Sequence, residues 1–130
     1  MQGDVRQERT GWRDGGISER HRGWGFNCPA VDIDFLLAEY DSCVVKALIE
    51  YKHARAAPAD PSGPSYIAIS WLATAAGIPF FDVVYADDYS TFTVRRINDV
   101  AKRMIGRDFS YTEAEYIRFL YKIRGRVKMI

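Results

Sequence analysis

The sequence predicts an α/β protein with a small mixed sheet, in which a central antiparallel hairpin is flanked by helices. Three observations lead to this fold class. Two strand-like runs, residues 31–40 and 44–53, follow each other across a short turn. Next come a segment with helical spacing of its apolar residues and two more strand-like runs. A capping signal then opens an amphipathic segment near the C-terminus, so helices and strands are interspersed along the chain.

The first elements are a short helix and the hairpin. Ser18 suits the N-cap of a helix over residues 18–22, and the glycine-containing segment 23–26 ends it. The run VDIDFLLAEY, residues 31–40, is predicted to be a strand. Asp41-Ser42 forms the turn, and VVKALIEYKH, residues 44–53, returns antiparallel to the first strand.

The remaining elements follow a loop rich in proline, whose residues cannot join a sheet ladder. Residues 65–77 have helical spacing and end at Gly77, a suitable C-cap. Thr112 and Glu115 form a capping box that opens the last helix. Between these helices the sequence predicts strands over residues 80–86 and 90–97 and a short helix over residues 98–105.

Length and composition indicate a single domain. The chain has 130 residues, of which 48% are hydrophobic and 14% aromatic, enough to bury a core without disulfides or a structural metal. Residues 1–17 are polar and are expected to be loose, and residues 18–130 form the domain. Neither a signal peptide nor an apolar run of roughly 18 residues is found, so a cytoplasmic protein without a membrane partner is expected.

Charge is distributed unevenly, although the formal net charge is only +1. No acidic residue follows Tyr116, so the end of the chain is either a phosphate-binding arm or a solvated helix face. Near the N-terminus, Arg20 and Arg22 could clamp a phosphate or could simply belong to a packed helix. The basic residues of the C-terminal cluster are Arg118, Lys122, Arg124, Arg126 and Lys128.

The hairpin contains the residues best suited to chemistry. Glu50 and Lys52 are two positions apart on the second strand, so both side chains leave the same face. They end an apolar run, where charges are unfavourable unless they are paired or bind a metal. Asp32 and Asp34 also share a face, and antiparallel pairing can bring one of them beside Glu50.

Two carboxylates and a backbone carbonyl would form an oxygen site suited to Mg²⁺. Such an ion can activate a water and neutralise charge on a phosphate, and Lys52 could stabilise the resulting oxyanion. The same hairpin residues would also suit a salt-bridge ladder on a solvated sheet face. His53 follows Lys52 directly and could contact phosphate or could simply be an exposed residue at the end of the strand.

The segments Asp34-Phe35-Leu36-Leu37 and Leu48-Ile49-Glu50-Tyr51-Lys52 resemble the motif of the PD-(D/E)xK nuclease superfamily. The helix and strand that follow match the order of elements in that family, so the resemblance covers roughly residues 30–97. It implies a restriction-endonuclease-like fold and Mg²⁺ or Mn²⁺ bound by Asp34, Glu50 and the Tyr51 carbonyl, with Lys52 as the catalytic lysine. Glu19 is the candidate for an acidic residue on an N-terminal helix.

The chain departs from the family motif at one point. The usual Pro-Asp pair is absent because Asp34 follows Ile33, and Asp32 is an alternative ligand. We favour Asp34 because the apolar run begins immediately after it.

The expected function is therefore metal-dependent hydrolysis of phosphodiester bonds in DNA. A homodimer would supply the two sites that cleavage of both strands requires. One alternative is a catalytically silent nucleic-acid-binding or assembly protein on the same fold. An unstructured loop before Asp34, or a metal-free pairing of Lys52 with Glu50, would favour it. The other alternative is a structural protein of a phage or mobile-element particle, in which the hairpin charges have no catalytic role.

Overall fold

The computed structural model describes residues 15–24, 31–56 and 60–125. The chain forms two compact units, residues 1–30 and 31–130. Helix α1 (Gly15–Trp24) belongs to the first unit, and the other described helices and strands belong to the second. The predicted division into a loose segment up to residue 17 and a domain beyond it stays a prediction. No helix in the described parts of the chain is long and apolar enough to cross a membrane.

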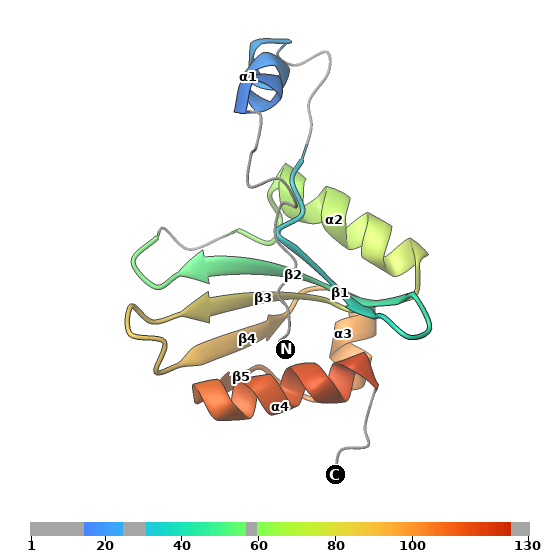
Figure 1. Cartoon of the computed structure of the whole chain (residues 1–130), viewed down its shortest axis with the longest axis vertical. Helices are drawn as coiled ribbons and strands as arrows, with labels where there is room; N and C mark the ends of the chain where they lie inside the picture. The colour runs from blue at the N-terminus through green and yellow to red at the C-terminus, as the bar shows by residue number, and fades with distance from the viewer. Residues whose placement is uncertain (1–14, 25–30, 57–59, 126–130) are drawn as a thin grey trace. The chain divides into compact units, whose positions relative to one another are not determined.

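Five strands of the second unit form one mixed sheet in the order β1-β2-β3-β4-β5 (Figure 1). β2 and β3 are parallel, and the other neighbouring pairs are antiparallel. A parallel pair needs a crossover connection, which helix α2 supplies. The strands are β1 (Phe35–Glu39), β2 (Val44–His53), β3 (Phe80–Tyr85), β4 (Phe92–Arg96) and β5 (Phe109–Tyr111), and the helices are α2 (Pro64–Ala75), α3 (Asp99–Met104) and α4 (Glu113–Arg124).

Helices cover both faces of the sheet, and each face buries an apolar cluster (Figure 1). On one face Leu48 and Phe80 pack with residues of α2. On the other face Ala47 and Ile49 pack with residues of α3 and α4. Because side chains alternate along a strand, Glu50 and Lys52 lie on the α2 face together with Leu48.

Local signals begin and end the helices near the predicted positions. The Thr112 hydroxyl accepts the Glu115 N–H while the Glu115 carboxylate accepts the Thr112 N–H, which completes the predicted capping box of α4. The side chain of Asn98 caps α3 by accepting the Ala101 N–H at 3.0 Å. Gly77 follows α2 with a φ of +74°, a left-handed conformation that favours glycine.

The structure also departs from the prediction in four places. The β1-β2 hairpin is not central, because β3 joins the sheet beside β2 and leaves β1 as an edge strand. The first strand begins at Phe35 rather than at residue 31, because the carboxylate of Asp34 accepts the Tyr51 N–H that a continuing strand would bind. Helix α1 begins at Gly15, so Ser18 lies inside the helix and is not its N-cap. Strand β5 was missed because its three residues are too few to show a periodic pattern.

Candidate functional site

The hairpin places Asp34 opposite Glu50 at the start of β1. Phe35 pairs with Ile49, so the next positions outward on the two strands are Asp34 and Glu50. Asp34 Oδ2 accepts the Tyr51 N–H at 3.0 Å, and the Asp34 backbone N–H in turn donates to the Glu50 carboxylate. These two hydrogen bonds hold both carboxylates beside the start of β1.

The environment of Glu50 opposes its ionisation. Its side chain is 14% exposed, and burial is the largest cause that raises its pKa above the ordinary value of 4.5. The negative charges of Asp34 and Asp82 raise this pKa further, while the charge of Lys52 and the hydrogen bond from Asp34 lower it. The site therefore holds an excess of negative charge, which a proton or a cation would relieve.

Lys52 lies on the same face as Glu50, as the alternation along β2 predicts. Its Nζ is 4.0 Å from Glu50 Oε2, and its side chain is 34% exposed. At this length and exposure the ion pair is weak, because water screens it. The ammonium group thus remains accessible from solvent beside the two carboxylates.

A third carboxylate adjoins this pair and was not assigned to the site from the sequence. Asp82 of β3 pairs in register with Glu50 and is fully buried. Arg95 of β4 donates from Nε to Asp82 Oδ1 at 2.9 Å and from Nη2 to Oδ2 at 2.6 Å. The Tyr66 hydroxyl of α2 donates to Oδ2 at 2.8 Å, so both carboxylate oxygens of Asp82 accept hydrogen bonds from the protein. Its signal in the sequence is an aspartate inside the apolar run FFDVV.

The other residues predicted to bind the metal are not held beside the Asp34 and Glu50 carboxylates in the same way. Asp32 is exposed in a segment without regular secondary structure, two residues before Asp34. Glu19 is exposed on α1, in the first unit, so its position relative to the hairpin is not defined. The Tyr51 ring lies on the α4 face, where its hydroxyl is 2.6 Å from that of Tyr116. Within residues 15–24, 31–56 and 60–125 no group of three or more His, Cys, Asp or Glu side chains is arranged to hold a metal ion.

His53 has partners within the protein at both ring nitrogens. Its Nε2 is 2.5 Å from Asp87 Oδ1, and its Nδ1 accepts the Arg55 N–H at 3.0 Å. Arg55 Nη2 is 2.5 Å from the other oxygen of Asp87. These contacts connect the end of β2 to the turn between β3 and β4, so the structural interpretation of His53 accounts for its position.

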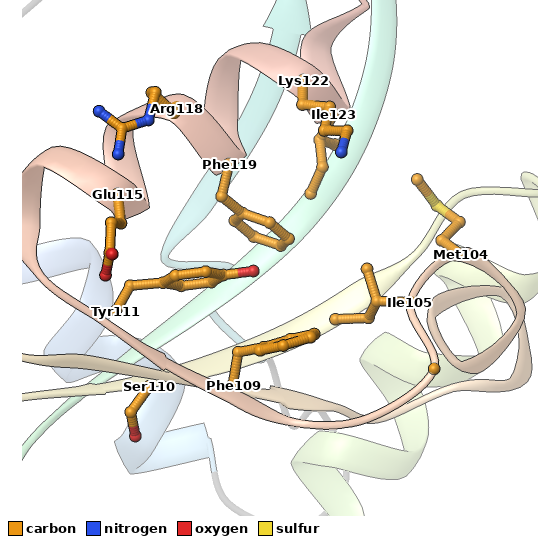
Figure 2. A pocket seen from close by; sticks show the side chains of 11 residues that line it. Met104, Ile105, Phe109, Ser110, Tyr111, Glu115, Arg118, Phe119, Lys122 and Ile123 are labelled. Carbon is orange, nitrogen blue, oxygen red and sulfur yellow. The ribbon is translucent and has the colours of Figure 1, made fainter.

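The predicted phosphate-binding residues fall into separate groups. Arg20 is exposed on α1, whereas the side chain of Arg22 and the residues Arg126 and Lys128 lie outside what the structure describes. Arg118 and Lys122 are exposed on α4 and line a cavity of about 890 Å³ between α3, β5 and α4. Figure 2 shows the side chains that line this cavity. The Arg124 guanidinium lies 4.7 Å from the centre of the Tyr121 ring.

The basic residues of α4 are therefore not neighbours of Glu50 and Lys52. α4 packs on the sheet face that buries Ile49, and Glu50 lies on the opposite face. A nucleic acid that reached both groups would have to pass around the edge of the sheet. The sequence could not reveal this separation, because it depends on which face each helix covers.

Comparison with protein-family models found no match, and comparison with curated proteins and with solved structures found none that is significant. The resemblance to the nuclease superfamily thus depends on the motif and on the order of the elements.

Proposed function

We propose that the chain is a metal-dependent nuclease that hydrolyses phosphodiester bonds in DNA, with Asp34, Glu50 and Lys52 as its catalytic group. The observation that supports this most is the pairing of Asp34 with Glu50 at a position where burial and like charge raise the pKa of Glu50. Such unfavourable placement of ionisable groups is typical of functional sites.

In this proposal the two hairpin carboxylates would hold a divalent cation. Asp34 and Glu50 supply hard oxygen donors, and their excess negative charge would be offset by Mg²⁺ or Mn²⁺. The backbone carbonyl of Tyr51 is the third donor in the proposal. A bound ion would supply an activated water and charge neutralisation at the phosphate.

The chain's own residues would position and stabilise the reacting groups. The hydrogen bonds between the Asp34 and Glu50 segments hold both carboxylates in place, which limits the reorganisation needed at the moment of reaction. Lys52 would place a positive charge beside the developing charge on the phosphate. A restriction-endonuclease-like arrangement is part of the proposal, and the parallel β2-α2-β3 crossover directly after the Glu-x-Lys strand supports it.

One observation favours a second function. Lys52 Nζ lies 4.0 Å from Glu50 Oε2, within the distance of an ion pair. That pairing is expected in a catalytically silent protein that binds nucleic acid or serves in assembly. In such a protein the ammonium group would replace the cation as the partner of Glu50.

Measuring metal affinity and cleavage in parallel separates the two functions. Mn²⁺ titration by calorimetry and cleavage of labelled single- and double-stranded DNA would be compared for the wild type and Glu50→Gln. We expect the variant to lose both while keeping its circular dichroism spectrum, because shape is preserved and only the ligand charge is lost. Asp32→Asn tests the alternative ligand, and Asp99→Asn, an exposed carboxylate on α3, is the matched control.

Two outcomes would count against the nuclease. Wild-type cleavage by Glu50→Gln would remove Glu50 from the chemistry. DNA binding without cleavage, at any Mn²⁺ or Mg²⁺ concentration, would support the catalytically silent alternative.

A further inference from the structure

A second pocket lies on the sheet face opposite Glu50, at the end of the sheet where β2 and β3 end and β4 begins. Its volume is about 400 Å³, within the roughly 300–1,000 Å³ of small-molecule sites. Five aromatic side chains line it together with one carboxylate at the first turn of α4. The lining residues are Phe35, Tyr51, Tyr85, Tyr89, Phe92 and Glu113.

The rings that line this pocket stand in two orientations. The Tyr51 ring is nearly perpendicular to those of Phe35 and Tyr85, with interplanar angles of 87° and 71°. The rings of Tyr85 and Tyr89 are nearly parallel, with centroids 5.8 Å apart and an angle of 7°. A flat nucleobase makes full contact with one ring orientation only. A compact, rounded group can contact rings of both orientations.

Two of the rings are exposed although they are large and apolar. Phe35 is 58% exposed and Tyr89 is 54% exposed. Tyr89 also has a φ of +60°, an unfavourable conformation for a residue with a side chain. Hydrogen bonds of the turn, such as that from the Ser90 N–H to Asp88 Oδ1 at 3.0 Å, hold it there. The fold thus holds an exposed ring against Tyr85 at some conformational cost.

The charge around the pocket favours a cation. Glu113 is the charged side chain among the described residues that line it. The His53 ring lies 5.4 Å from that of Tyr85 but does not line the pocket, and its Nε2 is paired with Asp87. The faces of aromatic rings carry partial negative charge and attract cations, most strongly those that are weakly hydrated.

We propose that this pocket binds a small quaternary ammonium compound, whose methylated cationic head contacts the rings while Glu113 offsets its charge. The head group is compact, positively charged and apolar at its surface, and so matches both the ring orientations and the charge of the lining. The proposal does not rest on the nuclease function, because the Tyr51 ring lines this pocket whereas the Glu50 side chain lies on the other face. Tyr51 would contribute only its backbone carbonyl to the proposed metal site.

The test compares choline with 3,3-dimethylbutan-1-ol, a neutral molecule of nearly the same shape. Binding of each to the full chain would be followed by calorimetry and by chemical-shift changes of the tyrosine rings. We expect choline to bind at least about ten-fold more tightly, because its charge is the only large difference between the two molecules. A contact between a cation and one ring increases affinity by about two-fold where the ring is exposed and by about thirty-fold where it is desolvated.

Substitutions then locate the site. Tyr89→Ala should weaken choline binding, by about two-fold or more, while Tyr89→Phe keeps the ring and should leave binding within about two-fold of wild type. Glu113→Gln should also weaken it. Tyr121→Ala removes a ring of similar exposure on α4, outside the pocket, and is the matched control. Thermal melting of each variant shows that the fold is intact.

Several results would overturn the proposal. Equal affinity for choline and its neutral analogue would mean an apolar pocket without charge selectivity. The absence of choline binding up to tens of millimolar, or equal effects of Tyr89→Ala and Tyr121→Ala, would exclude this pocket as the site. If thymidine monophosphate changed the chemical shifts of the tyrosine rings and choline did not, the pocket would be a base-stacking site instead.

Discussion

Replacing Arg95 by leucine should destabilise the fold by about 2–4 kcal/mol, because it leaves a buried carboxylate without its main counter-charge. Removing one partner of a buried ion pair costs roughly 3–5 kcal/mol. Two features lower this value here. The Arg95 side chain is 32% exposed, so water screens part of the interaction, and the Tyr66 hydroxyl still donates to Asp82 at 2.8 Å.

Urea denaturation at neutral pH measures this loss, and the neighbouring residue of β4 provides a matched control. Arg96 also forms an ion pair, with Asp108 at 2.9 Å, but the Asp108 side chain is 47% exposed. Arg96→Leu should therefore cost only up to about 1 kcal/mol. If Arg95→Leu costs no more than Arg96→Leu, Asp82 is not held as a buried anion and this account of the network is wrong.

Four further predictions concern other groups. The raised pKa of Glu50 means that the folded state holds this proton more tightly than the unfolded state, so wild-type stability should decrease as pH rises from the ordinary value of 4.5 through the folded pKa. Glu50→Gln should gain stability relative to wild type from mildly acid to neutral pH in chemical denaturation, and a constant difference would refute this. Lys52→Ala should lower single-turnover cleavage far more than Mn²⁺ affinity measured by calorimetry, whereas equal losses would make Lys52 a structural partner. Neutralising Arg118 and Lys122 together should make the salt dependence of DNA binding shallower by up to about two units of log–log slope, and an unchanged slope would leave them as a solvated face. Tyr116→Phe should cost about 0.5–1.5 kcal/mol in urea denaturation, through the lost hydroxyl contact with Tyr51.

The hairpin was predictable because its signals are local. The β-branched run of β2 and the Asp-Ser turn define the strand, and the observed bounds of β2 are those predicted. The capping box at Thr112 fixed the start of α4 in the same way. The first strand was predicted too long because the acidic side chain at residue 34 competes with the backbone for a hydrogen bond, an effect that hydrophobic periodicity does not contain.

The candidate site was predictable in part. Spacing alone placed Glu50 and Lys52 on one face, and the observed packing of β2 agrees. Which of Asp32 and Asp34 lies opposite Glu50 depends on the strand register, which the sequence does not contain. In the structure Phe35 pairs with Ile49, so Asp34 lies opposite Glu50. Which of the two binds a metal stays a prediction.

Asp82 and Glu50 show why the sequence cannot by itself separate a structural carboxylate from a functional one. Each is an acidic residue within or at the end of an apolar strand, and the two are neighbours in the sheet. Asp82 receives three hydrogen bonds from Arg95 and Tyr66, which lie 13 and 16 residues away in the chain. These partners compensate its charge within the protein, so its burial requires no ligand.

Glu50 differs because its described neighbours do not compensate its charge to the same degree. Of the two nearby carboxylates, Asp34 raises the pKa of Glu50 more than Asp82 does. The opposite charge on Lys52 Nζ is 4.0 Å from Glu50 Oε2. Burial is the largest cause that raises the pKa of Glu50, and the like charge of Asp34 raises it further. A cation or a proton would correct the imbalance at Glu50, whereas at Asp82 it would have to displace an arginine. The partners that distant strands and helices contribute therefore make Glu50, and not Asp82, the better candidate ligand.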